Sequence, residues 1–204
     1  MERDSFKTSL TKSILELADT LEQGKQNKVQ QETFLSLSEA NSALNLNDSN
    51  LAGSFIAILV SIVTQKDVAQ HVVRSLKVLH TYLLNDATVF KSFKPNKMLL
   101  KKMELTDHVL SANQQESEAA LELCAFIMRY HRSVDYADFS DSPFMVQRLR
   151  RFLEFKQWAE IEELQNITDS FSNKFDLFKA SNHNAFQEIL AYLDRITKEF
   201  THQD

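Results

Sequence analysis

The sequence predicts an all-α protein, and three observations support this prediction. Two glycines and two prolines in 204 residues leave the chain few ways to build hairpins or tight strand connections. Apolar residues recur at steps of three and four along most of the chain, which is typical of amphipathic helices. Asn, Asp and Ser precede several of these stripes, as helix N-caps do. We expect about nine or ten helices.

The first two predicted helices lie on either side of a glycine. A stripe of apolar residues runs from Phe6 to Leu21, and Gly24 is the expected C-cap of this helix. The second helix begins near Asn27 and ends before the polar break at residues 45–50. Both helices have one apolar face, so both need neighbouring helices to bury it.

The third predicted helix, residues 51–65, is apolar nearly all round, so we expect it to be the most buried element. Its N-cap candidates are Asp48, Ser49 and Asn50. The fourth helix follows Asp67 as its expected N-cap and ends near Asn85-Asp86. Its apolar stripe marks it as a core helix and consists of Val72, Val73, Leu76, Leu79, Tyr82 and Leu83. A second line along this helix is either a site or a solvated face and consists of Arg74, Lys77 and His80.

The later helices are separated by recognisable breaks. Pro95 disfavours helix at the residue before it and predicts a sharp corner. A helix begins near Met98, and the polar residues 111–118 are expected to link it to the next helix. Ser142-Pro143 then begins another helix, because serine is a good N-cap and proline suits the first helical position. Residues that we expect to face the interior in the last third are Leu149, Phe152, Leu153, Phe171, Phe175 and Phe178, although the last three also fit a groove for a partner's helix.

The arrangement of these helices has two candidates. Successive antiparallel helices joined by short links predict a right-handed superhelix, and a compact helical bundle fits the same pattern. Residues 1–204 are expected to form a single domain, because the chain is short and no long linker divides it.

Charge and cysteine content limit the classes of partner and the compartment. A net charge of −5 argues against a protein whose overall field draws it to nucleic acid or to an acidic membrane, and leaves a local basic patch as the way to bind either. Cys124 is the only cysteine, which excludes an intramolecular disulfide and fits a reducing compartment. The longest apolar run, residues 55–63, is about half of the roughly 20 residues that span a bilayer, and MERDSFKTS lacks the apolar core of a signal peptide. We therefore expect a cytoplasmic protein without a transmembrane segment.

Two blocks of sequence resemble the ENTH/ANTH superfamily, the helical membrane-binding domains of clathrin adaptors. The first block is residues 72–93, with a lysine, a leucine run and then histidine or tyrosine before a final aromatic residue. The second is residues 125–133, in which a phenylalanine, an arginine and a tyrosine lead into the next helix. The helices that carry the resemblance begin at Gln30, Leu51, Val68, Lys97 and Ser117.

The resemblance implies a stack of antiparallel helices that binds phosphoinositide headgroups where the first helix passes into the second. This junction reads QGKQNKVQQETF, so Lys25 and Lys28 are its only cations, and the family's proline and lysine-lysine-histidine cluster are missing. Surface attraction is worth only about 1 kcal/mol for each Lys or Arg. Two lysines alone would therefore bind weakly.

A denser basic run lies around Pro95. Lys91, Lys94 and Lys97, followed by Lys101 and Lys102, include no acidic residue among them. This run fits either a patch for an acidic membrane or partner, or an ordinary solvated helix end. A second cluster converges on an anion only if two helices pack side by side, and it consists of Arg129, His131, Arg132, Arg148, Arg150 and Arg151.

Nothing in the sequence indicates catalysis, a metal or a cofactor. The histidines are isolated from one another and form no H-x-x-x-H pair. Glu160, Glu162 and Glu163 beside Trp158 fit a solvated surface, and neither glycine belongs to a phosphate-binding loop. We predict a non-catalytic adaptor-like domain of membrane traffic and endocytosis that binds anionic phospholipid, a protein partner or both. The alternative is a helical protein-interaction module that does not bind lipid.

Overall fold

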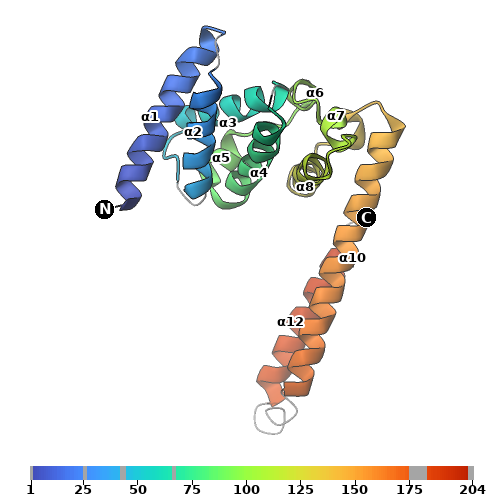
Figure 1. Cartoon of the computed structure of the whole chain (residues 1–204). Helices are drawn as coiled ribbons and strands as arrows, with labels where there is room; N and C mark the ends of the chain where they lie inside the picture. Colours follow the sequence, from blue (N-terminus) through green and yellow to red (C-terminus); the bar gives the residue numbers. More distant parts are fainter. Residues whose placement is uncertain (1, 25–26, 42–44, 66–67, 175–182, 202–204) are drawn as a thin grey trace. The chain divides into compact units, whose positions relative to one another are not determined.

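The computed structural model describes residues 2–24, 27–41, 45–65, 68–174 and 183–201. Within these ranges it contains only helices and no strand, so the all-α prediction is confirmed. Figure 1 shows their order. The helices are α1 (Glu2–Glu22), α2 (Lys28–Ala40), α3 (Ser49–Thr64), α4 (Ala69–Asn85), α5 (Ala87–Ser92), α6 (Lys97–Lys102), α7 (Leu105–Val109), α8 (Gln114–Tyr130), α9 (Tyr136–Phe139), α10 (Pro143–Lys174) and α12 (His183–Thr201).

The chain divides into two compact units, Met1–Leu149 and Arg150–Asp204. Helix α10 begins in the first unit and continues in the second. The single-domain organisation expected from the length of the chain stays a prediction.

Local capping explains where the first helices begin and end. The Asn27 carboxamide accepts a hydrogen bond from the Val29 N–H at 2.9 Å, and the Asp48 carboxylate accepts one from the Leu51 N–H at 2.7 Å. Both side chains satisfy backbone donors that the first turn of a helix leaves without a partner. Gly24 follows α1 with a φ of +69°, a conformation that favours glycine. These three positions agree with the predicted boundaries.

Other boundaries differ from the prediction. Helix α4 has Val68 as its N-cap, without a side-chain hydrogen bond, and the predicted cap Asp67 lies outside the described residues. The predicted polar link at residues 111–118 is wrong for its second half, because Asn113 caps α8 and the helix begins at Gln114. The described residues form eleven helices rather than nine or ten, since the short α7 and α9 carry too few residues for a clear periodic signal.

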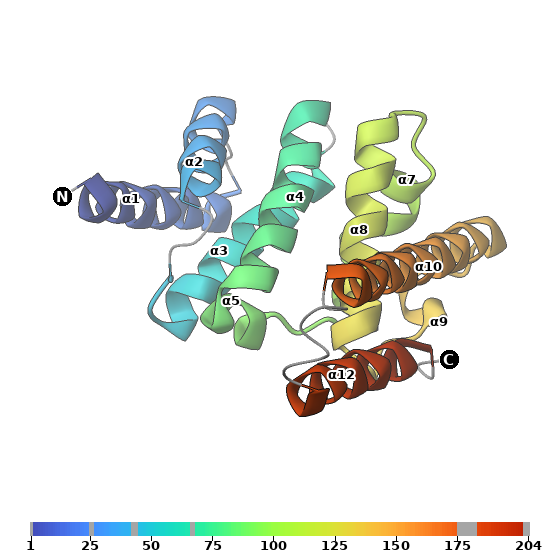
Figure 2. The ribbon, with the colours of Figure 1, turned by 90° about the horizontal axis from the view of Figure 1, so that it is seen from below.

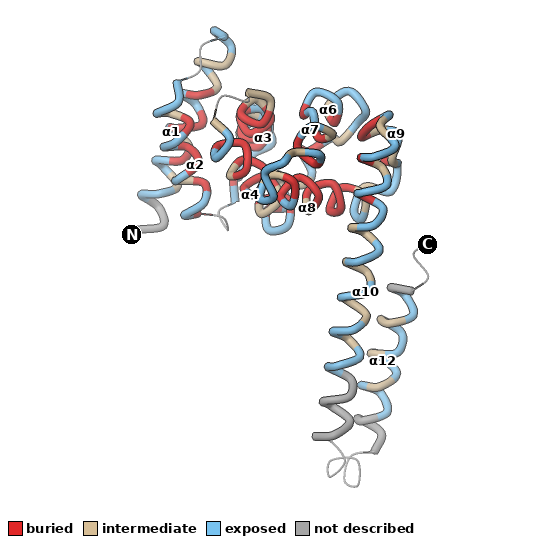
Figure 3. The backbone as a smooth tube through the Cα atoms, turned by 45° about the vertical axis from the view of Figure 1, so that its right-hand side comes forward, coloured by how far each residue is buried: buried red, intermediate tan, exposed pale blue. Residues whose placement is uncertain are grey.

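The core of the first unit is built around α4. This helix contacts α2, α3, α5 and α8, and α2, α4 and α8 lie in one row in Figure 2. Every residue of its predicted apolar stripe is buried, from Val72 to Leu83. Figure 3 shows buried residues concentrated on α3, α4 and α8. The expectation that residues 51–65 form the most buried helix is therefore wrong, because α4 and α8 are buried to a similar extent.

The second unit contains the greater part of α10 and the whole of α12, and these two helices run alongside each other in Figures 1 and 3. Among the predicted inward-facing residues, Leu149 is buried at the end of the first unit, whereas Phe152 and Leu153 are only half-buried. The Phe171 side chain and residues 175–182, which include Phe175 and Phe178, lie outside the described residues. Among the helices described, none has the length and apolar character needed to cross a membrane.

Candidate cationic surface

The basic run around Pro95 forms a corner between α5 and α6 whose two sides are both capped. The Asp86 carboxylate accepts hydrogen bonds from the Thr88 and Val89 N–H groups at 2.9 and 3.1 Å, which begins α5. Asn96 accepts one from the Leu99 N–H at 2.9 Å, which begins α6. The helix break predicted at the proline is present between these caps. The corner therefore has a defined backbone on both sides.

Aromatic rings attach this corner to the C-terminal end of α8. The imidazole of His131 stacks on the Phe90 ring, with the ring centres 5.1 Å apart, and meets the Phe93 ring edge-on at 6.0 Å. Phe90 also meets Phe126 edge-on at 6.2 Å, and Phe126 packs against Tyr130 at 4.7 Å. Such ring pairs stabilise a contact beyond the area that they bury. The segment that carries the corner lysines is thus held against α8 by these aromatic contacts.

Three predicted lysines are exposed at this corner. Lys91, Lys94 and Lys97 are exposed, and no carboxylate of the described ranges pairs with them. Lys101 differs, because its Nζ lies 3.5 Å from an Asp141 carboxylate oxygen. Met98, beside Lys97, is 79% exposed. We call Lys91, Lys94, Lys97 and Met98 the corner surface.

The second predicted cluster adjoins the corner surface through His131. Burial lowers the pKa of His131, and the positive charge of Lys94 lowers it further, which places Lys94 near the imidazole. Arg132, the next residue, is exposed. Of this cluster, His131 is thus the residue on which a corner lysine acts. The three predicted arginines of α10 are exposed: Arg148, Arg150 and Arg151.

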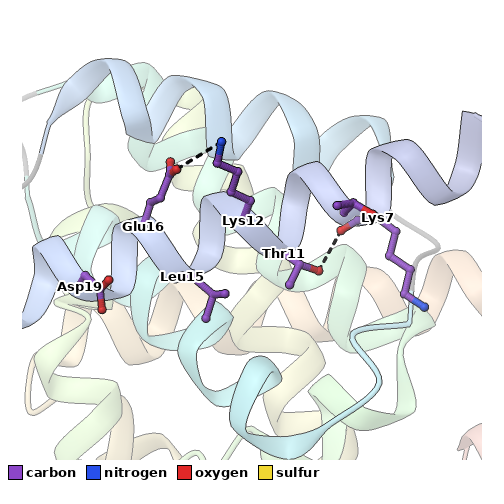
Figure 4. A pocket seen from close by; sticks show the side chains of 7 residues that line it. Lys7, Thr11, Lys12, Leu15, Glu16 and Asp19 are labelled. Atoms are coloured by element: carbon purple, nitrogen blue, oxygen red, sulfur yellow. Dashed lines mark hydrogen bonds and ion pairs between the residues drawn. The ribbon is translucent and has the colours of Figure 1, made fainter.

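The α1–α2 junction, where the ENTH/ANTH family binds headgroups, has fewer exposed cations than the corner surface. Lys25 lies outside the described residues, and Lys28 is exposed at the first position of α2. A hollow of about 260 Å³ between α1 and α2 is lined in part by Lys12, Glu16 and Val29. A second hollow of about 470 Å³ lies along α1 alone (Figure 4). Lys12 and Glu16 form an ion pair at 3.8 Å that borders both hollows, so neither gathers cations alone.

Two residues of the predicted polar line on α4, Arg74 and His80, contact neighbouring helices. The Arg74 guanidinium donates to the Glu32 and Glu39 carboxylates of α2, each at 2.6 Å. These contacts raise the pKa of Arg74, and the hydrogen bonds from Arg74 and then His71 lower the pKa of Glu32 to about 2. His80 meets the Phe126 ring edge-on at 5.4 Å. Arg74 and His80 therefore hold α4 to α2 and α8, while Lys77 is exposed.

A buried polar contact between α7 and α8 was not predicted. The His108 Nδ1 lies 2.6 Å from a Glu116 carboxylate oxygen, and the Ser111 hydroxyl donates to the other oxygen at 2.8 Å. His108 Nε2 is buried without a hydrogen-bond partner. The serine bonds the carboxylate and not the imidazole, so the three groups lack the order of a nucleophile and its base. A pair that faces across a loop has no periodic signal in the sequence.

The remaining reactive groups are buried or dispersed. Cys124 is fully buried, and burial raises the pKa of its thiol. In the part of the chain that the structure describes, no three His, Cys, Asp or Glu side chains come together as metal ligands would. Glu162 and Glu163 are exposed, as is Trp158. The corner surface is therefore the strongest candidate for a binding site.

Comparison with family models, with curated proteins and with solved structures finds no match to this chain. The resemblance to the ENTH/ANTH superfamily accordingly stays a prediction.

Proposed function

We propose that this chain is a non-catalytic, adaptor-like protein of membrane traffic that binds anionic phospholipid on the cytoplasmic side. In this proposal the first unit is a right-handed stack of antiparallel helices of the ENTH/ANTH kind. One observation carries it: Lys91, Lys94, Lys97 and Met98 are all exposed on the segments either side of Pro95. Cations that flank an exposed apolar side chain suit the charged headgroups and the apolar layer beneath them.

The corner surface has the strength expected of a peripheral membrane contact. Each lysine near an anionic surface contributes about 1 kcal/mol, so the three lysines together contribute about 3 kcal/mol, or roughly a hundredfold in partitioning. Insertion of Met98 adds about 1–2 kcal/mol. The net charge of −5 opposes long-range attraction, so the chain has to dock through this local surface.

Lys25 and Lys28, at the family's position, are proposed as a secondary contact with a phosphoinositide headgroup. Lys28 is exposed at the start of α2, where the helix dipole also favours an anion. Two lysines contribute about 2 kcal/mol, less than the corner surface.

The alternative function is a helical protein-interaction module that does not bind lipid. The acidic net charge and the missing lysine-histidine cluster at residues 23–34 favour it. The two functions differ in their need for anionic lipid, which a vesicle experiment measures directly.

Co-sedimentation with liposomes tests the proposal. We expect the wild type to bind vesicles that contain phosphatidylserine or a phosphoinositide and to ignore neutral vesicles. Binding should weaken as the salt concentration rises, since exposed charges are screened. Equal binding to neutral vesicles, or none to any vesicle, would favour the protein-interaction module.

Charge-reversal variants locate the site. The corner variant carries Lys91→Glu, Lys94→Glu and Lys97→Glu, and we expect it to lose at least about a hundredfold in partitioning. The junction variant carries Lys25→Glu and Lys28→Glu and should lose less. A control with the same change of charge on α1 and α4 should bind nearly as well as the wild type. This control variant carries Lys7→Glu, Lys12→Glu and Lys77→Glu. Equal losses in the corner and control variants would reduce the effect to net charge.

Met98→Asp tests insertion separately from charge attraction. We expect this variant to bind more weakly, and the remaining binding to be more sensitive to salt. Circular dichroism should show an unchanged helix content, because Met98 is 79% exposed. Unchanged binding would leave charge alone as the basis of the contact.

A further inference from the structure

The second unit has apolar side chains but little interior to hold them. Over residues 150–167 and 187–199, whose side chains the structure describes, none is buried. Phe155 is 68% exposed, Trp158 72% and Tyr192 55%. Two helices alone cannot cover large aromatic residues on their outer faces, which marks this surface as a candidate for association.

Two exposed aromatic residues of α10 that belong to the second unit lie on one line with two charges. Arg151, Phe155, Trp158 and Glu162 follow one another at steps of four, three and four, and all four are exposed. At about 100° per residue these positions fall within one narrow face of the helix. The half-buried Leu153 and Leu164 lie on the opposite side. We call the four exposed residues the Trp158 stripe.

The order of the Trp158 stripe is complementary to its own reverse. A two-fold axis between residues 156 and 157 of two antiparallel α10 helices places Arg151 opposite Glu162 of the second copy. The same axis places Phe155 opposite Trp158 of the second copy. The steps of four and three are the spacing of a coiled-coil seam, and a two-fold interface presents the same patch on both chains. A parallel pairing would instead bring Arg151 against Arg151.

We propose that the Trp158 stripe is a self-association surface and that its occupant is a second copy of this chain, paired antiparallel. Two aromatic residues from each copy form the centre, and an arginine–glutamate pair closes each end. Buried aromatic residues surrounded by arginine and other polar groups are the usual composition of an interface centre. The pairing accounts for both the exposed aromatic residues and the opposite charges beside them.

The size of the surface sets the expected strength. Phe and Trp bury about 150–250 Å² each, and roughly two thirds of this is exposed here, so the four rings of a dimer contribute roughly 400–700 Å². A stable interface buries about 1,200–2,000 Å². Even with the flanking charges added, the buried area of the pair lies below this range. We therefore expect a dimer that dissociates on dilution.

Sedimentation equilibrium of the full chain tests the proposal without lipid, so its failure is distinct from failure of membrane binding. From about 1 to about 100 µM, we expect the mean mass to rise from 23.5 kDa toward twice that value. Trp158→Ala should remain monomeric over the same range. A wild type that stays monomeric at every concentration would overturn the proposal.

Charge reversal tests the pairing itself. Arg151→Glu and Glu162→Arg each bring like charges together, so each should weaken dimerisation at least about tenfold. The double variant Arg151→Glu with Glu162→Arg restores the opposite pairing and should recover the dimer. Glu188→Arg, with the same change of charge at an exposed position of α12, is the control and should behave like the wild type. Failure of the double variant to recover refutes the proposed register.

Disulfide capture tests the orientation in chains that retain both charges. A mixture of Phe155→Cys and Trp158→Cys should form the mixed disulfide faster than either variant alone forms its own. The native Cys124 is buried and should not compete. Faster capture of each variant with itself would indicate a parallel pair and overturn the antiparallel arrangement.

Discussion

Tyr82 offers the sharpest test of the packing in the first unit. Its side chain is fully buried on α4, and its hydroxyl donates to the carbonyl oxygens of Asn41 and Ser38, at 2.9 and 3.1 Å. Both carbonyls lie at the end of α2, where a helix has no partners of its own for them. The ring centre lies 4.6 Å from that of Phe55. Tyr82 therefore has two roles: its ring fills the core, and its hydroxyl caps carbonyl groups at the C-terminal end of α2.

The change Tyr82→Phe separates these two roles. Phenylalanine keeps the ring contacts and removes the hydroxyl, so two buried carbonyls lose a donor. Leaving such groups without partners costs about 1–3 kcal/mol. A loss of about 2 kcal/mol in a unit of this size lowers the melting temperature by roughly 4–8 °C.

Urea unfolding followed by far-ultraviolet circular dichroism measures the loss. Trp158 fluorescence reports the second unit separately, because this is the only tryptophan in the chain. Tyr130→Phe is the control, since Tyr130 is half exposed and should tolerate the change within about 0.5 kcal/mol. If Tyr82→Phe and Tyr130→Phe are equally stable, the hydroxyl does not close α2 and the reasoning fails.

Three further predictions concern titration and reactivity. Hydrogen bonds from Arg74 and His71 hold the pKa of Glu32 at about 2, so its stabilising contribution is complete above about 4.5 and is lost as the pH falls through 2. Because Glu32 is half exposed, Glu32→Gln should cost about 1 kcal/mol of unfolding free energy at neutral pH. Urea titrations should show this difference shrinking as the pH falls from about 4.5 to about 2, and a difference that stays constant would contradict the role of the Glu32 carboxylate. Lys94→Glu should raise the pKa of His131 in an NMR titration, and an unchanged pKa would place the lysine elsewhere. Burial raises the pKa of Cys124, so its thiol should resist alkylation until denaturant is added, and rapid reaction in the native protein would contradict this burial.

The candidate site was only partly predictable from sequence. Lys91, Lys94 and Lys97 stand out in the sequence as a basic run without acids, and the structure exposes all three. Met98 was expected near the start of a helix, and α6 does begin at Lys97, yet the sequence did not indicate that Met98 is exposed while Met103 is buried. The helix there is only six residues long, too short for periodicity to identify its inward face. The Trp158 stripe, in contrast, has a four-three-four spacing that sequence reasoning is able to find.

The sequence by itself determined the helices and many of their ends. Scarce glycine and proline, apolar steps of three and four, and capping by Asn27 and Asp48 act within a few residues, so these features are visible along the chain. The predicted stripe of α4 is buried as expected for the same reason.

Only the tertiary structure decided which polar residues are engaged. Arg74 and Lys77 lie on one line of α4, yet Arg74 binds two carboxylates of α2 and Lys77 faces solvent. His108 similarly finds Glu116 across a loop, and His131 finds the rings of the α5–α6 corner. A side chain's spacing along a helix defines its direction but not the neighbour that it meets. That neighbour depends on how distant segments pack, because charge pairing and ring stacking act over a few ångströms in space.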